Sequence, residues 1–212
     1  MPAAAAWNPR FFEQDPRFWP IAPAARAFAE HTDFPAPEEL VAPGVSFVSA
    51  RKPRRARRPT APDIAYDARI LRGEVPTRPG SWHDFLNALV WATFPASKRA
   101  VHALQAALLE RARLPGSGAL PNARARAHDA LALLDEGGVL VLTAQAETLT
   151  LGFGHALYEA LVRGGPAVTA SALCFEVSRL PAPAEAAAVA DALLAARLQK
   201  PLFPADLSRR QF

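Results

Sequence analysis

The hydrophobic period of the chain changes at Gly137-Gly138, and this change constrains the fold more than any other feature of the sequence. Before it, from about residue 63, apolar residues recur at the three- and four-residue spacing of amphipathic helices. After it, Val139–Thr143 and Thr148–Phe153 are short runs of β-prone residues separated by four residues, a pattern typical of a β-hairpin. Helical patterns followed by strand patterns in one chain predict an α+β fold.

Capping and turn residues at the ends of each segment determine the predicted bounds of the helices and strands. Ser81 is expected to cap the helix that begins at Trp82, because its side chain can accept a free backbone N–H. The sequence therefore predicts an α+β, predominantly helical single domain with a small, mainly antiparallel sheet formed late in the chain. We expect helices over residues 22–30, 63–71, 82–91, 96–113, 121–134, 154–162 and 183–198, and strands over 45–48, 139–143, 148–153 and 168–177.

Residues 1–60 differ in composition from the rest, because proline and aromatic residues are concentrated there. Asn8-Pro-Arg-Phe-Phe12 and Asp15-Pro-Arg-Phe-Trp19 repeat one pattern, in which Asn or Asp before Pro starts a turn or helix. We expect residues 1–60 to be an N-terminal extension whose aromatic side chains pack on a globular α+β domain of residues 61–212.

The net charge of +4 comes from one segment. Arg51–Arg58 holds six of the 24 basic residues, and without it 18 basic residues face 20 acidic ones. Two interpretations remain open for this predicted exposed loop. It is a linker, or Arg54, Arg55, Arg57 and Arg58 contact the phosphates of a nucleic acid or an acidic partner. No nucleic-acid-binding motif accompanies it.

The sequence also restricts compartment and membrane contact. No apolar stretch reaches the roughly 20 residues that a membrane span requires. The N-terminus lacks the basic and hydrophobic segments of an export signal. The single cysteine, Cys174, lies in the apolar run Ala172–Val177, so we expect a buried structural thiol. These features predict a cytoplasmic protein without a membrane partner.

The first polar motif is His83, Asp84 and Asn87, at the start of the helix predicted from Trp82. The four-residue spacing places His83 and Asn87 on one helix face. At a helix N-terminus the backbone N–H groups favour anions and lower the proton affinity of histidine, which suits a neutral base or a metal ligand. The alternative is structural: Asp84 caps the helix start and His83 binds a loop.

The second motif, Asp135-Glu136, closes a predicted helix just before the glycine pair. Acidic side chains at a helix C-terminus oppose the helix dipole, so local propensity does not explain them. They could bind a metal, pair with a basic group or lie in a solvated turn. On the same helix, Asp129 is expected on the core side, paired with a basic side chain. Lys98 and His102 are expected on a solvated face of the helix predicted over residues 96–113.

The third motif places His155 and Glu159 four residues apart in the first turns of a helix that directly follows a strand. Gly152 and Gly154 permit a tight turn and close approach of a ligand to the backbone. A histidine and a carboxylate one turn apart can act as a general base with its orienting group or as metal ligands. An ordinary salt bridge within the helix is the alternative.

The order of these motifs resembles one uncharacterised family. The chain is similar, over about residues 60–180, to the bacterial family catalogued as domain of unknown function 3025. No activity is assigned to that family, so the resemblance implies a bacterial cytoplasmic protein and no particular reaction. The similarity is carried by Val75–Arg78, Trp82–Trp91, Phe94-Pro95, Lys98, Asp129, Asp135-Glu136-Gly137, Gly154-His155 and Glu159.

Two classes of function follow. One is a metal- or histidine-dependent hydrolase. Because two of the motifs begin helices and a basic segment lies nearby, a phosphate-containing substrate is favoured. The other is a non-catalytic binding protein, in which the motifs form a buried network and the arginine-rich loop contacts nucleic acid or an acidic partner. In the first, the catalytic candidates are His83, Asp84, Asn87, His155 and Glu159, and the candidate ligands of a divalent metal are Asp135, Glu136 and His155.

Overall fold

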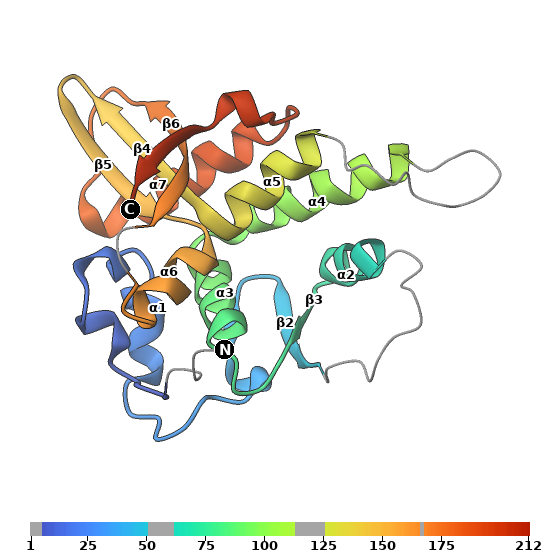
Figure 1. Ribbon diagram of the computed structural model, residues 1–212, viewed down its shortest axis with the longest axis vertical. Coiled ribbons are helices and arrows are strands. Elements are labelled where there is room, and N and C mark those ends of the chain that lie inside the picture. Colours follow the sequence, from blue (N-terminus) through green and yellow to red (C-terminus); the bar gives the residue numbers. More distant parts are fainter. Residues whose placement is uncertain (1–5, 51–61, 113–125, 166–167) are drawn as a thin grey trace.

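The computed structural model describes residues 6–50, 62–112, 126–165 and 168–212, which form an α+β fold (Figure 1). The helices expected from the sequence are present, with ends that shift by a few residues. The predicted helix over residues 22–30 is a short α-helix continued by a 3-10 turn at Arg26–Phe28. The helices are α1 (Ala22–Ala25), α2 (Pro62–Leu71), α3 (Trp82–Thr93), α4 (Pro95–Ala112), α5 (Arg126–Gly137), α6 (His155–Val162) and α7 (Pro183–Arg197).

The late sheet has the strand order β5-β4-β6-β7. The predicted hairpin is confirmed, since β4 (Gly138–Ala144) and β5 (Glu147–Gly152) pair antiparallel. The sheet is nevertheless mixed rather than mainly antiparallel, because β6 (Thr169–Glu176) runs parallel to β4. The chain passes through α6 between β5 and β6, and such a crossover allows a strand to return in the parallel sense. The edge strand β7 (Ser208–Gln211) was not predicted.

A second sheet joins the early part of the chain to the middle. It contains β1 (Val41–Ala42), β2 (Val45–Ser49) and β3 (Glu74–Thr77), and β2 pairs parallel with β3. Only β2 was expected. The run Glu74–Thr77 contains Pro76, which a strand tolerates at the sheet edge that β3 occupies. The ladder between β2 and β3 thus links the predicted extension to the predicted globular part.

Helix α3 lies at the centre of the fold (Figure 1), where it contacts α1, β1, α4, α6 and α7. Its apolar side chains are buried on all sides, as expected for a helix surrounded by other elements. Trp82 and Phe85 receive Trp7, Phe11 and Phe34 of the N-terminal segment, with ring centroids 4.5–6.4 Å apart in this cluster. The aromatic residues of the N-terminal segment therefore anchor it on α3, and α3 in turn presents His83 at its first turn.

Three expectations about burial are wrong. Cys174 is exposed, although Ala170 and Ala172 on the same face of β6 are buried. Asp129 is exposed as well, since α5 buries the face of Ala130 and Leu134. Lys98 and His102 are buried, with 0% and 3% relative exposure, where a solvated face was expected.

Two further features bear on the predicted partners. Among the helices of the described stretches, none is long and apolar enough to cross a membrane. Arg54, Arg55, Arg57 and Arg58 lie outside the described residues.

Candidate functional site

The first turns of α3 and α6 bring two histidines into contact. His83 and His155 have their Nε2 atoms 3.0 Å apart, and their rings meet edge to face with centroids 4.4 Å apart. The side chain of His155 is 5% exposed and that of His83 is 33% exposed. The pair therefore reaches solvent mainly on the His83 side.

Glu159 lies behind His83. Its Oε2 is 2.9 Å from Nδ1 of His83, and its other oxygen accepts a hydrogen bond from Arg163. An ionised carboxylate can only accept, so Nδ1 of His83 carries a hydrogen and donates it to Glu159. The expected pair of Glu159 with His155 in its own helix is therefore wrong, because Glu159 reaches across to α3 instead.

Glu136, at the end of α5, supplies the third group. Its Oε2 is 3.4 Å from Nε2 of His155, and its side chain is 54% exposed. A Cβ on Gly154 would lie closer than 3.0 Å to the backbone of Glu136, Gly137 and Gly138. Gly154 was expected to allow a ligand close to its backbone, but the backbone of the α5–β4 turn occupies that space instead. This close packing holds Glu136 next to His155.

These three side chains have the arrangement of metal ligands. One ligand atom each from His83, Glu136 and His155 lies within 4.8 Å of the others, and these residues are the only such group among the described residues. Ligands about 2.0–2.2 Å from a tetrahedral Zn²⁺ are about 3.3 Å apart. The separations of 3.0 and 3.4 Å at His155 are close to that value. Glu159 completes the carboxylate–histidine pairing that orients metal-bound imidazoles.

Burial sets the charge state of the cluster. It lowers the pKa of His155 to about 3, so the imidazole is neutral and its lone pair is available at physiological pH. Burial also raises the pKa of Glu136 above its usual value, against the opposing effect of His83. A cation bound between the ligands would favour the ionised carboxylate.

Asp135 forms a buried ion pair with Lys98, whose Nζ lies 2.5 Å from its Oδ1. The ammonium also lies 5.7 Å from the ring centroid of Trp91. Burial opposes ionisation of Asp135, yet the charge of Lys98 outweighs it and holds the pKa of the carboxyl well below its usual range. Asp135 is therefore half of a buried ion pair, and the group of ligand atoms formed by His83, Glu136 and His155 does not include it.

Asp84 and Asn87 also lie apart from the histidine pair. Asp84 accepts two hydrogen bonds from the Arg78 side chain and one from its backbone N–H, while Ser81 caps the helix as predicted. Burial opposes ionisation of Asp84, but Arg78 outweighs it and lowers the pKa of the carboxyl. Asn87 is 9% exposed within the core. Of the first motif, His83 alone belongs to the group of potential ligands that also contains Glu136 and His155.

One neighbour of the cluster, Arg163, was not singled out by the sequence reasoning, and another, Lys98, was placed wrongly. Arg163 binds Glu159, and the four-residue spacing on α6 is a signal that could have indicated it. Lys98 was noticed but was expected to be solvated. Its location in the core depends on how α4 and α5 pack, which helical spacing alone does not reveal.

A cleft of about 520 Å³ adjoins the cluster at Glu136. One wall is a face of α5, and the other comes from the start of α6 and from β6. The cleft is mostly apolar and is lined by Asp129, Ala132, Leu133, Glu136, Gly137, Ala156, Leu157, Val168, Thr169 and Ser171.

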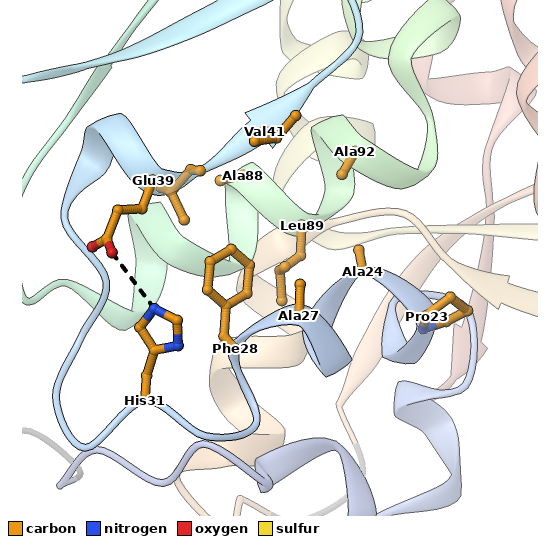
Figure 2. A pocket seen from close by; sticks show the side chains of 11 residues that line it. Pro23, Ala24, Ala27, Phe28, His31, Glu39, Val41, Ala88, Leu89 and Ala92 are labelled. Atoms are coloured by element: carbon orange, nitrogen blue, oxygen red, sulfur yellow. Dashed lines mark ion pairs between the residues drawn. The ribbon is translucent and has the colours of Figure 1, made fainter.

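A second groove provides a comparison. It lies between the α1 region and α3, has a volume of about 420 Å³ and carries a His31–Glu39 pair at 3.6 Å (Figure 2). Figure 2 shows this pair at one end of the groove, with small apolar side chains such as Ala27 and Ala88 along the rest. Unlike the cluster at α3 and α6, this histidine has a single carboxylate beside it among the groove's lining residues.

Comparison with known proteins identifies a family. A family model described as "Protein of unknown function (DUF3025)" matches residues 47–151. Residues 47–151 of the chain therefore correspond to this domain. The DUF3025 match begins earlier than the expected residue 60 and ends before residue 180. It therefore contains His83 and Glu136 but leaves His155 and Glu159 beyond its end. No curated protein and no solved structure is significantly similar to the chain.

Proposed function

We propose that this protein binds one Zn²⁺ through His83, His155 and Glu136 and uses it to hydrolyse a small molecule. The observation that carries the proposal is the convergence of the three ligand atoms within 4.8 Å of one another. Two histidines and a glutamate form a ligand set found in hydrolytic zinc sites, where the fourth position is left to water or substrate.

The exposure of the ligands favours a catalytic over a purely structural ion. Structural zinc sites are closed by four protein ligands. Here three ligands come from the described residues, and Glu136 and His83 are the partly exposed ones. A water molecule bound at the solvent side of such an ion would have a pKa of about 7 and could attack a polarised carbonyl or phosphoryl group.

Glu159 supports the same proposal. By accepting the Nδ1 hydrogen of His83, it leaves Nε2 free for the ion and fixes the ring orientation. Arg163 holds the other oxygen of Glu159. The alternative function, contact with nucleic acid through Arg54, Arg55, Arg57 and Arg58, concerns residues outside the described ones and stays a prediction.

Metal-dependent turnover tests this function. The full chain is stripped with a chelator, reloaded with Zn²⁺, Mn²⁺ or Fe²⁺, and assayed on chromogenic carboxylic esters, anilides and phosphoesters. We expect Zn²⁺ to restore hydrolysis of at least one class, and His83→Ala and His155→Ala to abolish it. His31→Ala is the matched control, because it removes a histidine that also pairs with a glutamate. Turnover that survives in the chelated protein or in His155→Ala contradicts the proposal.

A further inference from the structure

The cleft beside Glu136 indicates which substrates the proposed zinc site would accept. Along α5, Asp129, Ala132, Leu133 and Glu136 recur at three- and four-residue spacing and line one wall. At 1.5 Å per residue, Asp129 and Glu136 are about 10 Å apart along the helix axis. The cleft thus extends over two helical turns from the metal ligand Glu136 to a second carboxylate.

The surface between these two carboxylates is apolar. Leu133 projects from α5 with 49% relative exposure and so offers an apolar contact surface in the cleft. Leu157 of α6 and Val168 before β6 line the opposite side. An aliphatic chain placed here would bury its surface against these side chains, so a longer chain should bind more tightly than a short one.

The charge of the cleft determines which chemical group it favours at the end of the ligand that lies farthest from the metal. Its described lining residues include two carboxylates, Asp129 and Glu136, and no lysine or arginine. A phosphate or carboxylate on the ligand would be repelled by Asp129, whereas an ammonium group would be attracted. The hydroxyls of Thr169 and Ser171, two residues apart on β6, add hydrogen-bonding groups on the opposite wall.

We infer that this cleft binds the aliphatic chain of a substrate whose scissile ester or amide lies at the zinc and whose distal end is neutral or cationic. This inference rests on the proposed zinc site, but it specifies the substrate class independently. It replaces the expectation of a phosphate-containing ligand, which rested on helix N-termini and not on the groups that surround a bound molecule.

Hydroxamates separate the cleft from the metal, because one end of the molecule chelates zinc and the other end occupies the cleft. The zinc-loaded full chain is titrated calorimetrically with four probes: acetohydroxamate, octanohydroxamate, 8-aminooctanohydroxamate and 7-carboxyheptanohydroxamate. We expect octanohydroxamate to bind at least tenfold more tightly than acetohydroxamate. We also expect the amino-terminated chain to bind at least tenfold more tightly than the carboxyl-terminated one.

Two variants assign these differences to the cleft. Asp129→Asn should reduce the ratio between amino- and carboxyl-terminated probes to below threefold, and Leu133→Asp should remove the advantage of the octyl chain. Both should leave acetohydroxamate binding unchanged. Asp33→Asn, an exposed aspartate outside the lining residues, is the matched control and should change none of these values.

The outcomes distinguish the two proposals. If acetohydroxamate binds but the octyl chain adds nothing, or if the carboxyl-terminated probe binds best, the inferred substrate class is overturned while the zinc site stands. If acetohydroxamate itself does not bind the zinc-loaded protein, the zinc site fails and the inferred cleft specificity fails with it.

Discussion

His83 and His155 are 72 positions apart in the sequence, yet their Nε2 atoms lie 3.0 Å apart where the first turns of α3 and α6 meet. An ordinary hydrogen bond between the two rings has this length, and so does the separation of two nitrogens that bind one cation. The hydrogen on Nδ1 of His83 is donated to Glu159. Together with Glu136 the two nitrogens form the proposed metal site, and the predictions below concern this site and the contacts that hold the fold around it.

Glu159→Gln should weaken zinc binding without unfolding the protein. The amide can donate to Nδ1 of His83 and so favour the wrong tautomer, in which the hydrogen moves to the metal-facing Nε2. Loss of such an orienting carboxylate typically lowers metal affinity by about 10–100-fold. Competition with a chromogenic chelator measures the change. Arg163→Ala is the control and should lower affinity by less than the Glu159 variant, since it leaves the carboxylate in place; equal affinity of Glu159→Gln and the parent chain would contradict this role.

Gly154→Ala should disturb the site through the backbone. A Cβ at this position would lie closer than 3.0 Å to backbone atoms of Glu136, Gly137 and Gly138, so the α5–β4 turn must move away. We expect a loss of about 1–3 kcal/mol in the free energy of unfolding, together with weaker zinc binding. Gly137→Ala is the matched control, because its Cβ would meet open space. Urea denaturation and zinc titration of both variants check this, and similar results for the two would rule out the proposed backbone contact.

Lys98→Met should be strongly destabilising. The Lys98 side chain is fully buried, and its removal leaves the Asp135 carboxylate in the core without its counter-ion. Breaking one side of a buried pair costs about 3–5 kcal/mol. The double variant Lys98→Met/Asp135→Leu should recover much of this loss, because no unpaired charge remains. Chemical denaturation of the single and double variants provides the measurement. A double variant no more stable than Lys98→Met would show that the penalty arises from packing and not from charge.

Asp15 should stabilise the folded protein at neutral pH and lose this effect in acid, when its carboxylate is protonated. Hydrogen bonds from Arg17 lower the pKa of this carboxyl, and Arg17 also donates to the backbone oxygen of Phe212, which ties the N-terminal segment to the chain end. Because the folded-state pKa is depressed, the contribution of Asp15 is complete above its unfolded pKa of about 3.9 and is lost as the pH falls below that value.

The matching experiment compares the parent chain with Asp15→Asn. We expect a difference of about 1 kcal/mol in the free energy of unfolding at pH 7. The difference should be retained at pH 5 and should shrink when denaturation is repeated at pH 3 and again at pH 2. A difference that stays constant over this range would show that the ionised form of Asp15 is not what stabilises the protein.

Part of this architecture could be predicted because it is local. Ser81 before Trp82, and the change of period at Gly137-Gly138, define helix starts and the hairpin from neighbouring residues alone. Strands β3 and β7 were not predicted, and the reason also lies in their own residues. Glu74–Thr77 contains a proline, and Ser208–Gln211 is polar with every residue exposed, so neither run shows the apolar alternation of a half-buried strand.

The composition of the candidate site could be predicted less well, because it depends on helix packing. His83 and His155 were expected near one another as two helix starts, but whether Asp84, Asn87 or Glu136 joins them depends on how the helices rotate against each other. The same limit explains Lys98. Alanines occur on several faces of α4, and since alanine is tolerated both in cores and on surfaces, the buried face of that helix is poorly defined by its sequence.

The zinc content of the purified full chain tests the central claim most directly. The protein is stripped, equilibrated with Zn²⁺ against a chelator of known affinity, and analysed by elemental mass spectrometry alongside His83→Ala, His155→Ala, Glu136→Ala and the His31→Ala control. The account predicts one zinc ion per chain in the parent and the control, and at least 100-fold weaker binding in each of the three ligand variants. A parent chain that takes up no zinc, or ligand variants that bind it as tightly as the parent, would contradict the account.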